Sequence, residues 1–263
     1  MQDDCYLPTV SGALWPGVSY FCSTRQGGVS LPPYDSLNLG THVNDNVDNV
    51  ARNRMKLQAL LPAPALWLNQ VHGVNVAEFH NGDSAQCLSA DPQADAAITT
   101  CSNCVLAILT ADCLPVVIAD EDASVLGVAH AGWRGLAAGV LENTLLAMRK
   151  HLKADRALKA WVGPGISQPC FEVGPEVRAA FVDADPRTAA YFLPASGNGK
   201  GSSHKWFADL PGLARYRLNA SGVDSVALSN RCTFREADLF YSYRRTPVTG
   251  RMATVAWLQG ATN

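Results

Sequence analysis

Short apolar runs of the kind that form β-strands recur along the chain, and they constrain the fold more than any other feature. Many of them are rich in Val, Ile and aromatic residues and are separated by Gly, Pro, Asn and Asp, which favour turns. They lie at residues 18–24, 65–71, 74–79, 94–100, 105–110, 115–120, 124–131, 157–163, 225–230, 239–245 and 252–259. A chain with this many strands has to bury a large β-sheet.

Helical patterns are fewer. Residues 48–61 carry apolar side chains at helical spacing and end at Pro62, and residues 136–152 have Lys and His where the last turn would lie. Residues 175–185 and 208–222 are two further candidates. A plain doubly wound fold needs a helix after nearly every strand, and this chain has too few helical patterns for that. The sequence therefore predicts an α+β or mixed α/β fold, with helices covering a large mixed sheet or two packed sheets.

The composition places limits on organisation and partners. The chain has 263 residues, a net charge of -2, 48% hydrophobic residues and 17% charged residues. This length can bury one sizeable core, and we find no internal repeat or long linker. We therefore predict a single domain over residues 1–263, with a surface loop at 194–206. The absence of a basic excess argues against a nucleic-acid partner.

The sequence also bears on location. The start of the chain has acidic residues where a signal peptide needs a basic region, and no segment reaches the ~18 apolar residues of a membrane span. We expect a cytoplasmic protein with no membrane partner, present as a monomer or homodimer. Eight cysteines, at 5, 22, 87, 101, 104, 113, 170 and 232, are then expected to be thiols rather than disulfides. The CxxC of Cys101 and Cys104 precedes a strand-like run, which favours structural thiols.

Three residues with metal-binding or nucleophilic side chains lie at equivalent places. His72 is in a glycine-marked turn between two apolar runs, Cys113 lies between two others, and His130 ends a run before a glycine. Strand ends that lead into turns are where such folds place functional side chains. Two His and one Cys make a ligand set for catalytic zinc, which leaves a fourth position open. Each residue taken singly is more often a buried core residue, and the spacings match no compact zinc motif.

Glycine-rich and basic segments supply candidates for anion binding. GWRG at 132–135 precedes a helical pattern, so its backbone N–H groups and Arg134 would suit an anion. Arg25 lies beside a Gly-Gly pair, and the loop at 38–44 adds polar groups. Spacing alone does not show whether these groups, or Arg244, Arg245 and Arg251 near the C-terminus, face a pocket. A tight turn with a surface arginine remains the simpler reading of GWRG.

The joint pattern of several segments resembles the YfiH family, also called the laccase-domain or multicopper polyphenol oxidase family. The resemblance runs in order over nearly the full chain. It rests on TRQGGVSLPPYDSLNLG (24–40), NQVHG (69–73), TADCLPV (110–116), AHAGWRG (129–135), the GPGI…FEVG segment (163–174) and YSYRR…TGRMA (241–253). It implies a single-domain αββα-type layered fold, distantly related to cysteine-dependent deamidase toxins. It also implies that His72, Cys113 and His130 form the metal-binding triad, with zinc as the usual ion.

The resemblance leaves the substrate open. Family members are assigned purine nucleoside phosphorylase activity on adenosine, inosine, guanosine and methylthioadenosine, together with adenosine deaminase activity. Others are named polyphenol oxidases or are assigned peptidoglycan editing. We expect a zinc-dependent purine nucleoside phosphorylase with adenosine deaminase activity, in which phosphate attacks the ribose C1′ or water attacks the purine C6. Arg25, Asn38, Gln70 and Arg134 are the expected substrate-binding residues, and Asp112 is an acid/base or ligand-orienting candidate that would equally suit a turn cap.

Four alternatives remain at this stage. Cys113 and His130 would also suit a metal-independent cysteine hydrolase, or an amidase that edits UDP-MurNAc precursors carrying a wrong amino acid. A His₂Cys site would accept one copper ion for phenol oxidation, but the chain's six His cannot supply a full multicopper centre. The last alternative is a structural zinc, which would need a fourth protein ligand such as Cys101 or Cys104.

Overall fold

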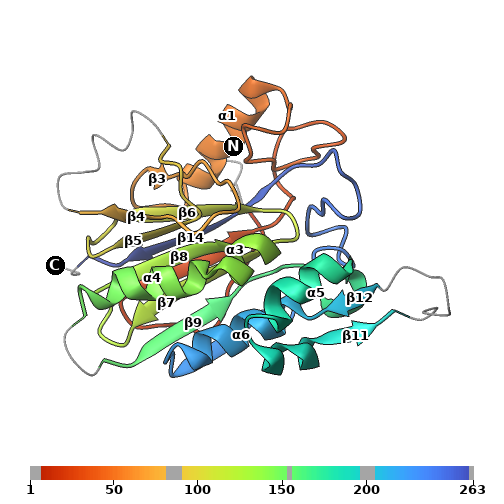
Figure 1. Cartoon of the computed structure of the whole chain (residues 1–263). Coiled ribbons are helices and arrows are strands. Elements are labelled where there is room, and N and C mark those ends of the chain that lie inside the picture. Colours follow the sequence, from red (N-terminus) through yellow and green to blue (C-terminus); the bar gives the residue numbers. More distant parts are fainter. Residues whose placement is uncertain (1–6, 81–90, 153–155, 196–204, 261–263) are drawn as a thin grey trace.

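The computed structural model describes residues 7–80, 91–152, 156–195 and 205–260. Within these residues, two large β-sheets pack face to face and helices cover both outer faces (Figure 1). The mixed α+β fold predicted from the sequence is confirmed, including the four layers of the αββα arrangement.

The first large sheet has the strand order β1-β2-β14-β6-β3. Strand β14 is antiparallel to both of its neighbours, whereas β3 runs parallel to β6. The bounds are β1 Thr9–Val10, β2 Val18–Ser23, β3 Ala65–Leu66, β6 Val105–Thr110 and β14 Met252–Leu258.

The second large sheet has the order β13-β9-β7-β8-β5-β4 and is also mixed. Its two edge strands run parallel to their neighbours, while the central strands pair antiparallel. The bounds are β4 Val76–Phe79, β5 Ala96–Thr99, β7 Leu114–Asp120, β8 Leu126–Ala131, β9 Leu158–Val162 and β13 Ser225–Leu228.

The remaining elements lie on the outer faces or beside them. A small antiparallel sheet has the order β10-β12-β11, with bounds Glu172–Val173, Trp206–Ala208 and Phe192–Pro194 respectively. The helices are α1 Val47–Gln58, α3 Trp133–Ala138, α4 Val140–Arg149, α5 Pro175–Val182 and α6 Leu210–Ala220. Short 3₁₀ turns cover Gln168–Cys170 and Pro186–Tyr191.

Strand alternation explains why both large sheets are buried on two faces. In β7, Val116 and Ile118 face the cluster that includes α4 and α6, whereas Val117 faces the first sheet. In β6, Ile108 faces the second sheet and Ala107 faces the layer of α1. Because successive side chains point to opposite faces, such strands appear in the sequence as continuous apolar runs rather than alternating ones.

The predicted helix over 136–152 is wrong in its details. The structure divides it into α3 and α4 at Gly139, whose φ of 101° lies in the left-handed region. Glycine adopts this conformation without a steric cost, so it ends α3 and allows α4 to start in a new direction. The other three predicted helices are confirmed with small shifts of their ends.

Two of the strand predictions are corrected. The apolar run at 239–245 forms turns, in which Phe240 and Tyr241 are fully buried and the Tyr241 hydroxyl donates to the Tyr34 carbonyl. Residues 67–71 leave the sheet after the two-residue strand β3. In both segments, side-chain hydrogen bonds replace the ladder of a sheet, which a hydrophobicity pattern does not reveal.

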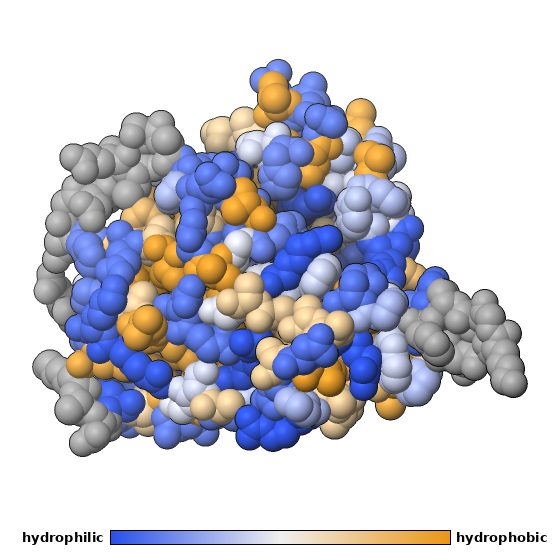
Figure 2. Space-filling model, viewed as in Figure 1, coloured by the Kyte–Doolittle hydropathy of each residue, from blue (hydrophilic) through white to orange (hydrophobic). Residues whose placement is uncertain are grey.

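The surface, the helices and the cysteines can be compared with the expectations from composition. On the face seen in Figure 1, hydrophilic side chains predominate and hydrophobic ones are scattered between them (Figure 2). None of the helices in the described segments combines the length and the apolar character needed to cross a bilayer. Cysteines 22, 101, 104, 113, 170 and 232 take part in no disulfide, as predicted. Cys5, Cys87 and most of the predicted loop, residues 196–204, lie outside the described residues.

Candidate metal centre

The fold brings His72, Cys113 and His130 together. His72 lies in the loop between β3 and β4, Cys113 in the turn between β6 and β7, and His130 near the end of β8. Because Pro115 of β7 pairs with His130 of β8, the turn before β7 lies beside the imidazole. One donor atom from each of the three residues falls within 4.8 Å of the others. Three segments separated in sequence thus form one cluster.

The donor set and its spacing fit a metal ion. Cys113 Sγ lies 3.9 Å from His72 Nε2. A tetrahedral zinc ion with ~2.3 Å bonds to sulfur and ~2.0–2.1 Å bonds to nitrogen would hold such a pair roughly 3.5 Å apart. A small inward movement would therefore complete the coordination. A thiolate with two imidazoles suits zinc and copper alike, so the donors do not identify the metal.

Asp95, which the sequence analysis missed, organises the cluster. Its Oδ1 lies 2.8 Å from His130 Nδ1, which leaves Nε2 of that ring for a metal. The same carboxylate accepts hydrogen bonds from the backbone N–H groups of Val71, His72 and Gly73. These bonds hold His72 at a φ of 60°, in the left-handed region that non-glycine residues seldom adopt. One buried carboxylate therefore fixes both imidazole ligands.

The glycines of GWRG serve close packing around the cluster. A Cβ atom at position 132 would lie 2.8 Å from Cys113 Sγ and 3.0 Å from His72 Cδ2. A Cβ at position 135 would lie 2.8 Å from the Gly73 carbonyl oxygen. The requirement for glycine at these positions is therefore steric, and the turn would pack in this way whether or not it also binds an anion.

The ionisation of Cys113 and His130 is coupled. Burial alone would raise the pKa of the Cys113 thiol, but the His130 charge and hydrogen bonds from both imidazoles lower that pKa to about 6. Burial alone would lower the pKa of His130, but the Cys113 thiolate and Asp95 raise it to about 9. Without a metal ion, these shifts favour a thiolate and an imidazolium at neutral pH. The thiolate is the form that binds metal or acts as a nucleophile, whereas His130 has to lose its Nε2 proton before that nitrogen can bind a metal.

The cluster opens into a cavity of about 430 Å³, within the size range of small-molecule sites. The wall combines apolar and aromatic side chains with three guanidinium groups and the carboxylate of Asp112. Its lining residues are His42, Gln70, His72, Leu109, Thr110, Ala111, Asp112, Cys113, His130, Trp133, Arg134, Ile166, Phe171, Leu210, Tyr243, Arg244 and Arg251. The aromatic surface suits a planar ring, and the arginines suit an anion.

Asp112 lies at the cavity, but its carboxylate is already engaged. It accepts hydrogen bonds from Thr233 Oγ1 at 2.6 Å, Ser242 Oγ at 3.0 Å and the Arg244 backbone N–H at 2.7 Å. Its φ of 92° is also in the left-handed region. These contacts join the turn before Cys113 to the chain near residue 244. The geometry favours a residue that orders the cavity wall over one that exchanges protons.

Two of the predicted substrate-binding residues line the cavity. Gln70 exchanges a pair of hydrogen bonds with the backbone of Leu109, at 2.9 and 2.8 Å, so its amide is occupied in holding the His72 loop. Arg134 lies with its guanidinium 4.4 Å from the ring centre of Trp133. Of the two, Arg134 has the charge that an anionic substrate group would need.

The structure places the other two predicted residues outside the cavity lining. Asn38 is fully buried, and its Oδ1 accepts from the Arg251 backbone N–H, so it positions an arginine that does line the cavity. Arg25 pairs with Asp35 at 3.0 Å and donates to the Ala237 carbonyl in a separate surface depression. That these two bind substrate directly stays an untested prediction, and their place outside the lining does not support it, because loop residues near one another in sequence diverge in space.

Arg244, Arg251 and His42 line the cavity, although the sequence did not show which way their segments face. Arg244 donates to the Glu172 carbonyl, and Arg251 donates to the carbonyls of Thr249 and Gly250, while both side chains line the cavity. Burial lowers the pKa of Arg251. His42 also lines the cavity, and its pKa is lowered by burial and by neighbouring positive charge. The sequence signals for this wall were the basic residues at 244, 245 and 251 and the polar loop at 38–44, and Arg245 is not among the residues that line the cavity.

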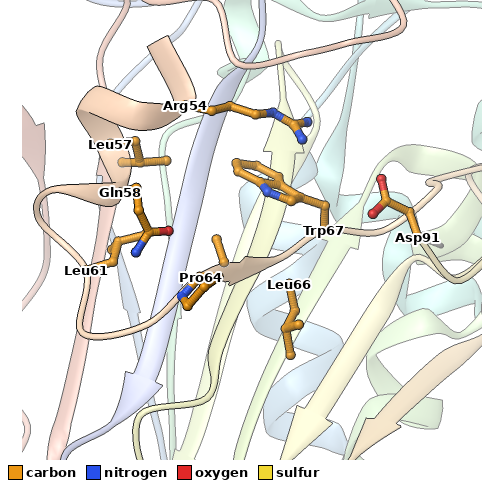
Figure 3. A pocket seen from close by; sticks show the side chains of 9 residues that line it. Arg54, Leu57, Gln58, Leu61, Pro64, Leu66, Trp67 and Asp91 are labelled. Atoms are coloured by element: carbon orange, nitrogen blue, oxygen red, sulfur yellow. The ribbon is translucent and has the colours of Figure 1, made fainter. Parts of the chain in front are cut away.

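A second, smaller cavity of about 240 Å³ lies between α1 and the segment around β3 (Figure 3). The Arg54 guanidinium stacks 4.0 Å from the ring centre of Trp67, and Asp91 lies nearby (Figure 3). Asp91 is the only metal-ligand type of side chain among its lining residues. Of these two cavities, the larger one therefore contains the cluster of metal-binding and nucleophilic side chains.

Comparisons with known proteins identify the family of this chain. Residues 19–259 match the family model described as multi-copper polyphenol oxidoreductase laccase. Purine nucleoside phosphorylase YfiH of Escherichia coli K12 is 44% identical over 249 residues, covering 93% of this chain and 96% of that protein. Purine nucleoside phosphorylase PA4543 of Pseudomonas aeruginosa is also 44% identical, over 248 residues that cover 93% and 96% of the two chains.

Solved structures show the same fold. The Neisseria meningitidis protein NMB0706 superposes with a TM-score of 0.86 at 41% identity, covering 97% of this chain and 99% of that chain. YlmD from Geobacillus stearothermophilus gives a TM-score of 0.79 at 30% identity, covering 96% and 100%. Because both the family model and these relatives span nearly the whole chain, the protein belongs to the YfiH family of laccase-like polyphenol oxidoreductase domains.

Proposed function

We propose that this protein is a zinc-dependent purine nucleoside phosphorylase, acting on adenosine, inosine, guanosine and methylthioadenosine, with adenosine deaminase activity at the same site. The observation that carries the proposal is that the metal-ligand triad, three arginines and several aromatic side chains line one cavity. The names of the relatives from Escherichia coli and Pseudomonas aeruginosa support the same activity.

His72, Cys113 and His130 would hold the zinc ion, with Asp95 orienting the two imidazoles. When bound, the ion would supply Lewis-acid polarisation of a substrate oxygen or of water. His130 is buried and Cys113 is partly buried, so such electrostatic effects are strengthened on that side of the triad, because the local dielectric constant there is low; His72 is exposed and leaves the site open.

The other cavity residues would bind and orient the substrates. Trp133, Phe171 and Tyr243 offer apolar surface for the purine ring, and Arg134, Arg244 and Arg251 offer donors for phosphate. In phosphorolysis a phosphate oxygen forms the bond to ribose C1′, the bond from C1′ to N9 breaks, and the purine leaves with a proton. In deamination, water adds at the purine C6 and ammonia leaves. Holding both reactants in one cavity lowers the entropic cost of either reaction.

The test is an assay on protein purified without added metal. Zinc and copper are quantified per chain, adenosine is supplied with and without phosphate, and the products are separated by chromatography. Phosphate-dependent release of adenine is expected, with inosine as the product of deamination. C113A should lose both products and the triad's zinc, whereas the matched control C170A, whose side chain does not line the cavity, should retain them.

Three results would contradict the proposal. Activity retained in zinc-free C113A would exclude the metal mechanism. Loss of activity on thiol alkylation without loss on chelation would identify a Cys113–His130 hydrolase instead. Zinc without either product would overturn the nucleoside assignment, and cell-wall precursors carrying a wrong amino acid or phenols with copper would then be the substrates to assay.

A further inference from the structure

A second group of metal-ligand side chains lies outside the cavity. Glu78 belongs to β4, the edge strand of the six-stranded sheet, and His80 follows that strand directly. Residues at positions i and i+2 of an extended segment project from the same face. His151 comes two residues after the end of α4, which packs against β4. None of the three lines the large cavity, and the cluster shares no residue with the triad.

The spacing of the donor atoms suits a single ion. Glu78 Oε2 lies 3.6 Å from His80 Nε2 and 3.5 Å from His151 Nε2. All three donor atoms lie within 4.8 Å of one another. A tetrahedral ion with bonds of ~2.0–2.1 Å separates its ligands by roughly 3.3 Å, so two of the three distances are already close to that value. The two rings are 5.4 Å apart and tilted by 52°, so neither stacks flat against the other.

The surroundings favour a cation and leave the site accessible. The side chains of Glu78, His80 and His151 are 30%, 45% and 28% exposed, so an ion and its water ligands can enter from solvent. His151 lies just past the C-terminus of α4, where the helix dipole is negative. Burial acts to raise the pKa of Glu78, but hydrogen bonds with Lys150 and His151 lower it overall, which keeps the carboxylate ionised.

Lys150 provides an internal competitor for the carboxylate. Its ammonium lies 3.3 Å from Glu78 Oε1, the oxygen that does not face the two imidazoles. The ion pair leaves Oε2 available to a metal, but its positive charge opposes a second cation nearby. Removing this charge should therefore tighten metal binding, a result that a purely structural ion pair would not produce.

We propose that Glu78, His80 and His151 form a second metal site, which binds a divalent transition-metal ion of the Zn²⁺ or Cu²⁺ class. Two imidazoles and a carboxylate are ligands that these ions accept, and Cu²⁺ generally binds such donors more tightly than Zn²⁺ does. The site lacks a thiolate and is exposed, so it is weaker than the triad. An ion there would join the edge strand β4 to the end of α4. Protein exposed to excess zinc or copper would then carry more than one ion per chain.

The test measures metal stoichiometry by equilibrium dialysis against Zn²⁺, and separately against Cu²⁺, followed by elemental analysis. The wild type should bind two ions, H80A and H151A one ion each, and C113A only the weaker ion. K150Q should lower the dissociation constant of the weaker ion at least threefold. The matched control K205Q removes a lysine whose ion pair with Glu172 lies elsewhere, and it should leave that constant unchanged.

Copper spectroscopy distinguishes the cluster from other surface ligands. With Cu²⁺ in the C113A background, electron paramagnetic resonance should show two nitrogen ligands, and H80A should remove one of them. One ion per wild-type chain, equal stoichiometry in wild type and H80A, or no change in K150Q would overturn the proposal. H80A and H151A in the otherwise wild-type chain keep the test decisive if C113A fails to fold. No part of it depends on turnover of a nucleoside.

Discussion

The Asp95 carboxylate lies 2.8 Å from Nδ1 of His130, and it also holds the backbone of the loop that carries His72. Two candidate ligands of the triad therefore depend on the buried side chain of Asp95, the residue that directly precedes β5.

Replacing Asp95 should weaken metal binding more than folding. D95N keeps the size of the side chain but removes the charge that fixes the His130 tautomer and accepts three backbone N–H groups. We expect the zinc dissociation constant of the triad to rise about 10–100-fold, as measured by competition with a chromophoric chelator. The exposed D183N is the matched control and should not change it. An unchanged constant in D95N would refute the orienting role.

A methyl group at position 132 should disrupt the triad. In G132A the new Cβ would fall 2.8 Å from Cys113 Sγ, closer than carbon and sulfur can pack. We expect a loss of bound zinc in elemental analysis while circular dichroism stays native. G73A makes the same change in the same cluster, where the nearest atom is 3.4 Å away, and it should retain the metal. Equal zinc content in the two variants would rule out the steric argument.

Asp112 should matter for stability as well as for the cavity wall. D112A leaves the hydroxyls of Thr233 and Ser242 and the N–H of Arg244 without their acceptor. It should lower the free energy of unfolding by about 2–4 kcal/mol in urea titrations. D112N keeps an acceptor and tolerates the positive φ, so it should lose less. If D112A retained full stability and lost only turnover, Asp112 would be the acid/base group instead.

Replacing Arg134 should weaken phosphate binding, whereas replacing Arg25 should lower the stability of the fold. R134A removes a cavity cation, so we expect the KM for phosphate to rise about tenfold with unchanged unfolding free energy. R25A removes contacts to Asp35 and the Ala237 carbonyl, so it should lower stability by about 1–2 kcal/mol and leave KM unchanged. Steady-state kinetics and urea unfolding on both variants provide the comparison. The reverse pattern would restore Arg25 as the phosphate ligand.

Chelation should make one thiol reactive and leave another inert. The pKa of Cys113 is lowered to about 6, so at pH 7 it is a thiolate once no metal covers it. Burial raises the pKa of Cys22 to about 12, so that thiol stays protonated at any pH below this value. Iodoacetamide at pH 7 with chelator, followed by peptide mapping, should modify Cys113 and spare Cys22. Protection of Cys113 under these conditions would show that its thiolate is not stabilised as described.

Much of the fold could be read from the sequence because burial leaves a local signature. The strands β6, β7 and β8 appear as apolar runs since both of their faces are covered, and Pro62 and Gly222 mark the ends of helical patterns. Local patterns failed where a single residue redirects the chain, as Gly139 does, or where a segment such as 239–245 is buried without pairing.

For the site, the sequence by itself selected the three candidate donors that the structure brings together, because His and Cys at strand ends are chemically distinctive and the family motifs surround them. Only the tertiary structure decided what encloses them. Asp95 and Arg251 reach the site through strand pairing and loops that no periodicity encodes, and Arg25 and Asn38 turn away for the same reason. Contacts between residues distant in sequence depend on the packing of whole layers, so their partners emerge only once those layers are assembled.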